Sequence, residues 1–153
     1  MGVTTDGRRE LEGLIRELSR ELGVEFAFLC ERCVGEPERA RTLVLCCACE
    51  LLEPRTYDLA GTPCERVHRR GSAYHSHGVR EIYPRDESLA RWGVEAYLGV
   101  AVHGPTGDVL GHLGVMHAAP LADPSTIETR LRALAAQVAP LLVQQPAQTG
   151  SAN

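Results

Sequence analysis

Cysteine is the residue type whose spacing in this sequence most directly suggests chemistry. Cys30 and Cys33 are separated by two residues, and Cys46, Cys47 and Cys49 follow in one short run. Zinc takes four thiolate or imidazole ligands in a tetrahedron, and Cys-x-x-Cys is its usual half-site. If the two segments form neighbouring strands, Cys30 approaches Cys46 or Cys47. These five thiols are therefore candidate metal ligands.

Two other interpretations of the same cysteines stay open. Cys-Cys-x-Cys is not a standard zinc knuckle, and alternation along a strand puts Cys47 and Cys49 on one face and Cys46 on the other. One alternative is redox sensing. The other, which we favour, is plain burial, because cysteine is common among small buried residues on central strands.

Cys64 is predicted to lie in the first turn of a helix, where the helix dipole and free N–H groups favour a thiolate. The position also suits a sulfur that only packs beneath a sheet, which is the interpretation we favour.

Histidine and tyrosine side chains are the other candidates for a site. His75 and His77 suit metal binding or titration near neutral pH, although a loop histidine pair is more often simply exposed. His112 stands among apolar strand residues and needs a hydrogen-bond partner if it is buried. Together with the thiol above, we expect six side chains to line a ligand pocket: Tyr74, His75, His77, Tyr97, His112 and Cys64.

Conventional catalytic motifs are missing from the sequence. It has no glycine-rich phosphate loop and no Gly-x-Ser-x-Gly elbow. We therefore predict a binding module with no catalytic residues and no identified cofactor. The alternatives are a thiol-based redox enzyme or sensor, or a domain that binds a metal or haem through Cys and His.

Composition limits the class of protein. The 153 residues are 44% apolar and 24% charged, as in a single soluble globular domain. A formal charge of −4 argues against nucleic acid as a partner. No apolar run approaches the roughly 20 residues that span a bilayer, and no signal peptide is recognisable, so we expect no membrane association and a cytoplasmic location.

The elements that must position these residues follow from the sequence pattern. Residues 8–22 have helical periodicity and end at Gly23. Residues 24–33 and 42–52 read as the two strands of an antiparallel hairpin, with Phe26 and Phe28 on one side and the second strand central. Thr62, with Pro63 and Glu65, predicts a capping box and a short helix that ends near Gly71.

The second half repeats the hairpin-and-helix order. Residues 72–93 are irregular, with one helical turn at 88–92, and suit a functional cover. Residues 94–102 and 109–117 form the second hairpin. A helix starts at Asp123, and its apolar stripe has a coiled-coil spacing that favours packing against another helix: Ile127, Leu131, Leu134, Val138 and Leu141. The polar segment 144–153 is predicted to be a flexible tail.

Three segments resemble the GAF domains of bacterial signalling proteins, in particular those found next to histidine kinase and diguanylate cyclase modules. They are Tyr57-Asp-Leu-Ala-Gly-Thr-Pro-Cys-Glu, Gly93-Val-Glu-Ala-Tyr-Leu-Gly-Val and Gly107-Asp-Val-Leu-Gly-His-Leu-Gly-Val. The three agree in order and spacing, and the resemblance covers residues 8–143. The whole chain, 1–153, is accordingly predicted to be one GAF domain.

The resemblance implies an α+β fold related to PAS domains. In this fold a six-stranded antiparallel sheet carries the terminal helices on one face and a cover of loops and short helices on the other. It also implies a pocket beneath residues 72–93 and homodimers built through helices 8–22 and 127–142. Family members bind cyclic nucleotides, haem, bilins, small metabolites or metals, and many have no known ligand, so the fold does not fix the ligand.

Several family features are missing here. The cyclic-nucleotide branch has an Asn-Lys-Phe-Asp signature and the bilin branch a Cys-His pair, and the sequence has neither. The sulfoxide reductase branch carries cysteines in its cover, whereas residues 72–93 contain none. No output domain follows, so we expect the signal to leave through the dimer or a separate signalling protein.

Overall fold

The computed structural model describes the backbone of residues 3–152 and the side chains of residues 3–143. Its five helices are α1 (Thr5–Leu22), α2 (Pro63–Arg70), α3 (Val79–Ile82), α4 (Glu87–Arg91) and α5 (Pro124–Ala152). Its seven strands are β1 (Phe26–Cys33), β2 (Arg39–Cys47), β3 (Glu50–Leu51), β4 (Thr56–Asp58), β5 (Ser72–His75), β6 (Ala96–His103) and β7 (Val109–His117). None of the described helices is long and apolar enough to cross a membrane. The predicted flexible tail, 144–153, lies outside the described side chains.

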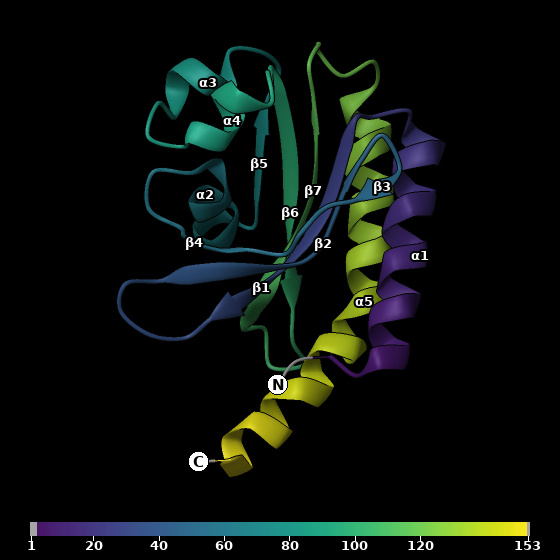
Figure 1. Cartoon of the computed structure of the whole chain (residues 1–153), viewed down its shortest axis with the longest axis vertical. Helices are drawn as coiled ribbons and strands as arrows, with labels where there is room; N and C mark the ends of the chain where they lie inside the picture. The colour runs from purple at the N-terminus through teal and green to yellow at the C-terminus, as the bar shows by residue number, and fades with distance from the viewer. Residues whose placement is uncertain (1–2, 153) are drawn as a thin grey trace.

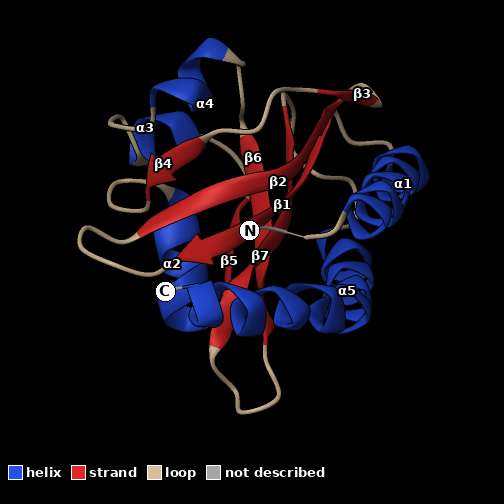
Figure 2. Ribbon diagram, turned by 60° about the horizontal axis from the view of Figure 1, so that its bottom comes forward, coloured by secondary structure: helices blue, strands red, loops and turns tan. Residues whose placement is uncertain are grey.

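One antiparallel sheet organises the molecule, with the strand order β3-β2-β1-β7-β6-β5 and with β4 also paired to β2. Helices α1 and α5 cover one face, and α2, α3 and α4 cover the other (Figures 1 and 2). The predicted fold class is therefore confirmed. The sheet has seven strands because the short β3 and β4 both pair along the outer edge of β2.

Strand alternation divides the interior into two cores. Along β1, Phe26, Phe28 and Cys30 face the cover, whereas Ala27 and Leu29 face the terminal helices. The prediction that the two phenylalanines share a side is correct. Because the sheet separates the two cores, a structural change on the cover side can affect the terminal helices only through the sheet itself.

Helix ends follow their sequence signals closely. Gly23 ends α1 in the left-handed region, with φ 66°. Asp123 precedes α5, and its carboxylate accepts a hydrogen bond from the Thr126 backbone N–H at 3.2 Å. The apolar stripe of α5 packs within the chain against both the sheet and α1. The predicted packing against another helix is therefore only part of its contacts.

The segment predicted as one strand over residues 42–52 is instead a hairpin. β2 begins earlier, at Arg39, and ends at Cys47, and β3 returns along it after a two-residue turn. Ala48 and Cys49 form that turn with φ of 51° and 69°. Such turns are usually marked by Asn-Gly or Asp-Gly, so Ala-Cys gives no sequence signal. The strand expected to be central thus lies near the edge, and β1 and β7 occupy the middle.

Candidate functional site

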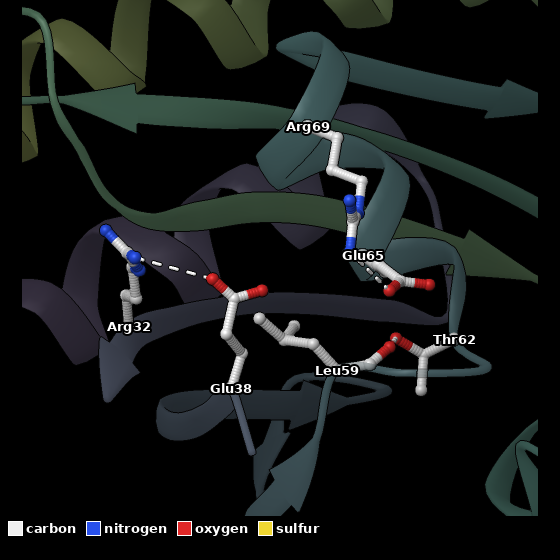
Figure 3. A network of polar contacts seen from close by, with 6 residues as sticks. All are labelled: Arg32, Glu38, Leu59, Thr62, Glu65 and Arg69. Atoms are coloured by element: carbon white, nitrogen blue, oxygen red, sulfur yellow. Dashed lines mark hydrogen bonds and ion pairs between the residues drawn. The ribbon is translucent and has the colours of Figure 1, made fainter. Parts of the chain in front are cut away.

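The turn that leads into α2 positions Cys64. Thr62 precedes the helix and Pro63 occupies its first turn, as predicted. The predicted capping box is wrong, however. The Thr62 hydroxyl donates to the Leu59 carbonyl oxygen at 2.8 Å, and the Glu65 carboxylate pairs with Arg69 at 3.1 Å (Figure 3). The hydroxyl closes the preceding turn instead of capping the helix. Cys64, in the first turn of α2, is buried against the sheet.

A narrow cavity of about 40 Å³ lies between the sheet and the cover. Phe28, Leu45 and Met116 form much of its sheet wall, and Leu89 and Trp92 close it from the cover side. Trp92 stacks on Phe26 with ring centroids 5.1 Å apart. Apolar walls with a few polar groups are typical of small-ligand sites, although this volume is far below the roughly 300–1,000 Å³ of such sites.

The polar end of the cavity is a cluster around the Tyr57 hydroxyl. This oxygen lies 3.3 Å from the Cys64 sulfur, 3.5 Å from the Cys30 sulfur and 3.1 Å from His112 Nε2. Tyr97 also donates to the Cys64 sulfur, at 3.3 Å. The predicted need of buried His112 for a partner is thus met by a tyrosine from β4, 55 residues away in sequence.

The cluster continues outward through a second histidine. His112 Nδ1 lies 2.8 Å from His68 Nε2 on α2. If Tyr57 donates to Cys64, His112 donates to Tyr57 from Nε2 and accepts from His68 at Nδ1. His68 Nδ1 is then an acceptor, and it is buried without a hydrogen-bond partner among the described residues.

Burial keeps four groups of the cluster uncharged: the Cys64 thiol, the Tyr57 and Tyr97 hydroxyls and the His68 ring. It raises the pKa of the Cys64 thiol, although the hydrogen bonds from Tyr57 and Tyr97 act in the opposite direction. Burial also raises the pKa of both tyrosines and lowers the pKa of His68 from 6.5 to about 3, aided by His112 and Arg32. At neutral pH these four groups are therefore uncharged hydrogen-bonding partners, and the Cys64 thiol is a poor nucleophile.

A second, larger and more polar hollow of about 330 Å³ adjoins the cavity and shares four lining residues with it: Arg55, Tyr57, Asp86 and Ser88. At the boundary of the two hollows, the Arg55 guanidinium lies over the rings of Tyr57 and Trp92, with its Cζ atom 5.4 Å from each ring centroid. The cavity therefore opens to solvent through a charged mouth.

The structure brings together three of the six residues predicted for the pocket. Cys64 and Tyr97 line the cavity, and His112 reaches it through Tyr57. The other three do not line it: Tyr74 and His75 belong to β5, which pairs with β6, and His77 follows that strand. Tyr74 is exposed, His75 contacts the Tyr83 hydroxyl at 3.2 Å, and His77 contacts Ser76 at 2.8 Å.

The five candidate metal ligands do not converge. Cys30 lies opposite Thr42, after a register shift at Leu29, so it does not approach Cys46 or Cys47 as expected. Cys46 belongs to the core on the helix side, whereas Cys30 faces the cover. Among the residues described, no group of three or more His, Cys, Asp or Glu side chains is arranged to hold a metal ion.

Several residues that shape the cavity were not predicted. Tyr57, Arg55 and Asp86 stand in segments that look like ordinary polar connections. Trp92 falls in the predicted cover, where the sequence assigns it no role. The available signal was that Trp92 is the single tryptophan of the chain, at the end of a helical turn among charged residues.

The comparisons with known proteins agree with this architecture. The family model for the GAF domain matches residues 6–142. The fold is similar to the GAF domain of an Acinetobacter phosphoenolpyruvate-protein phosphotransferase, with a TM-score of 0.71 and 15% identity over 94% of this chain and 86% of that one.

Two further solved structures share the fold. A type II free methionine-R-sulfoxide reductase from Thermoplasma acidophilum has a TM-score of 0.66 and 12% identity over 90% of this chain and 93% of its own. A Stigmatella aurantiaca phytochrome photosensory core module has a TM-score of 0.66 and 12% identity over 90% of this chain and 33% of its own. No curated protein matches the sequence. The family match and the architecture together establish that this chain belongs to the GAF domain family.

Proposed function

We propose that this GAF domain is a non-enzymatic sensory module that binds a small, largely apolar ligand in the cavity beneath α4. The observation that carries the proposal is the cavity itself, with aromatic and aliphatic walls and a neutral hydrogen-bonding end. Apolar walls supply affinity, and a few fixed polar groups supply orientation.

Signalling then follows from a shift between two states of the cover. The present cavity of about 40 Å³ is too small for an organic ligand, so a ligand that contacts Leu89 and Trp92 favours a state in which α4 lies farther from the sheet. Phe28 lies on the ligand side of β1, and its neighbour Leu29 contacts the core on the helix side. The change thereby reaches α1 and α5, which we propose transmit it within a homodimer or to a separate signalling protein.

The test uses Trp92, whose fluorescence reports directly on the cavity because the chain has no other tryptophan. Native mass spectrometry of the purified protein first identifies any retained ligand by excess mass. A library of small planar compounds is then titrated while Trp92 emission is followed. We expect saturable changes for some compounds.

Two variants decide whether binding occurs in the cavity. Leu45→Phe enlarges a side chain of the cavity wall and should abolish the saturable signal. Leu51→Phe is the matched control, because Leu51 is 37% exposed on β3 and does not line the cavity. A saturable signal that survives unchanged in Leu45→Phe would place the ligand elsewhere and overturn the proposal.

A thiol-based redox function is the second candidate, because Cys30 and Cys64 contact the same Tyr57 hydroxyl. Two thiols could form a disulfide while reducing a hydroperoxide to an alcohol and water. Cys30→Ser and Cys64→Ser, tested separately for peroxide or sulfoxide consumption with dithiothreitol present to reduce the disulfide after each cycle, decide between the two functions. Turnover that is lost in both variants would favour the redox function.

A further inference from the structure

Two cysteines on the helix side of the sheet form a second thiol pair, separate from Cys30 and Cys64. Cys46 and Cys49 are spaced as Cys-x-x-Cys around the turn between β2 and β3. Both pack into the core on the side of α1 and α5, whereas Cys47 packs against the core on the cover side. The predicted alternation, with Cys47 and Cys49 on one face, is therefore wrong, because the turn brings Cys49 back to the side of Cys46.

Hydrogen bonds from two other segments fix the backbone of this turn. The Ala48 N–H donates to the Glu25 carbonyl oxygen at 2.8 Å, and Arg16 Nε on α1 donates to the Cys49 carbonyl oxygen at 3.1 Å. Ala48 and Cys49 have φ of 51° and 69°, a region that residues with a Cβ atom adopt at a cost in free energy. The contact with α1 therefore helps to hold Cys49 in place at the end of β2 (Figure 1).

The surroundings of the Cys46 sulfur include its partner. Burial raises the pKa of this thiol, and the neighbouring Cys49 thiol raises it further. The Cys49 backbone N–H, the Ser19 hydroxyl and the Arg16 guanidinium act in the opposite direction. Both the thiol and the N–H of Cys49 are thus close to the Cys46 sulfur, in agreement with their packing in one core.

The two thiols differ in their access to solvent. Cys46 is fully buried, whereas Cys49 is only partly buried. An oxidant in solution therefore meets Cys49 first, and Cys46 needs no access to solvent in order to attack the oxidised sulfur beside it. We propose that Cys46 and Cys49 form a reversible disulfide when the protein meets a hydroperoxide. This site lies on the opposite side of the sheet from the proposed ligand cavity and does not depend on it.

The reaction balances with the hydroperoxide as the oxidant. The Cys49 sulfur attacks one peroxide oxygen and the O–O bond breaks, so Cys49 becomes a sulfenic acid and the other oxygen leaves with the thiol proton as an alcohol. The Cys46 sulfur then attacks the Cys49 sulfur. The S–O bond breaks, and the hydroxyl group leaves as water with the proton of Cys46. Two thiols are thereby oxidised to one disulfide, which an external dithiol can reduce again.

The experiment maps the disulfide after hydrogen peroxide is added to the reduced protein. The sample is quenched in acid and unfolded, free thiols are blocked with N-ethylmaleimide, and disulfides are then reduced and labelled with iodoacetamide. We expect the second label on Cys46 and Cys49, and its loss when dithiothreitol is added before the quench. Cys49→Ser should remove the second label from Cys46. Cys47→Ser is the matched control, because Cys47 faces the other core, and should leave the pair unchanged.

The other outcomes overturn the inference. A second label on Cys46 that persists in Cys49→Ser would show that Cys46 has a different partner. A second label on Cys30 and Cys64 alone would overturn this pair and support the redox alternative on the cover side instead. If every thiol stays free, or if Cys49 is oxidised only to a sulfinic acid that dithiothreitol does not reverse, the two cysteines are not a disulfide site.

Discussion

The six cysteine side chains differ sharply in their access to solvent. Cys30, Cys46 and Cys64 are 2%, 0% and 6% exposed, whereas the other three are only partly buried. Burial is also the main cause that raises the pKa of Cys46 and Cys64, which keeps their sulfurs protonated. Both factors reduce reactivity, since the thiolate is the nucleophile and must be reached by its reagent.

We therefore predict two rates of thiol modification by a bulky maleimide-polyethylene glycol. Cys33, Cys47 and Cys49 should be labelled first, and the three buried cysteines only when the protein unfolds. Band shifts over time, followed by peptide mapping, measure the order, and labelling in guanidinium gives the full set of six. Rapid labelling of Cys64 in the native protein would contradict the prediction and favour the redox alternative.

The His68 and His112 pair gives a prediction on pH. In the folded protein the pKa of His68 is about 3, against an ordinary value of 6.5. Between these two pH values the unfolded chain binds a proton at His68 that the folded chain does not. The contribution of neutral His68 to the free energy of unfolding is therefore complete above pH 6.5 and is lost as the pH falls toward 3. In His68→Gln, which does not titrate, the urea midpoint should fall less steeply with decreasing pH than in the unmodified protein.

The control for that measurement is His103→Gln, because His103 is exposed at the end of β6. It should leave the pH dependence unchanged. At neutral pH, His68→Gln should cost about 1 kcal/mol, the typical contribution of one hydrogen bond. If the urea midpoint falls equally steeply with decreasing pH in His68→Gln and in the unmodified protein, His68 does not remain neutral in the folded protein.

At the scale of elements, the close approach of β7 to β1 depends on a glycine. A Cβ atom placed on Gly111 would lie 2.0 Å from the Cys30 carbonyl oxygen, a backbone atom that has no room to move. Gly111→Ala should therefore destabilise the fold by about 3 kcal/mol or more, since overpacking of a core typically costs about 1–3 kcal/mol. Urea denaturation measures the change.

Gly13→Ala is the matched control in α1. Nothing lies within 4 Å of a Cβ atom at this exposed helical position. Alanine loses less backbone entropy than glycine on folding, so this variant should gain about 0.5–1 kcal/mol. If both substitutions have the same sign, the packing explanation for Gly111 is wrong.

The elements that the sequence predicts correctly are those with local signals. Gly23, Pro63 and Asp123 mark helix boundaries because caps involve only neighbouring residues. The turn at residues 48–49 and strand β5 lack such signals: the first has no Asn or Gly, and the second is only four residues long. Their conformations follow from pairing with distant strands, which overrides local propensity.

The candidate site is less predictable for the same reason. Cys64 and His112 were identified from their local settings, but Tyr57, which joins them, is seven residues from one and 55 from the other. Its place depends on β4 pairing with the end of β2. The prediction that His75 and His77 face the ligand assumes that residues 72–93 form a loop over the pocket. Residues 72–75 instead pair with β6 and form the edge strand of the sheet.

At the scale of the whole molecule, the sheet lies between α2, α3 and α4 on one side and the terminal helices α1 and α5 on the other (Figure 1). The proposed ligand site is on the side of α4. The helices are therefore free to transmit a signal without contacting the ligand. Most large apolar residues of α5 are already buried in the chain, and its outward face carries the small residues Ala133 and Ala136 beside the polar Arg132 and Gln137. Small residues let a second helix approach closely, which fits the expected homodimer.

The last prediction tests that homodimer. Ala136→Arg places a charge at the centre of the outward face of α5, where burial in a dimer would leave it unpaired. Sedimentation velocity over a range of concentrations should show a dimer for the unmodified protein and a dissociation constant at least about tenfold higher for the variant. Thr106→Arg adds the same charge to the exposed turn between β6 and β7 and should leave assembly unchanged. A monomer at all concentrations in the unmodified protein would contradict the dimer, and transmission would then have to pass from α1 and α5 to a different protein.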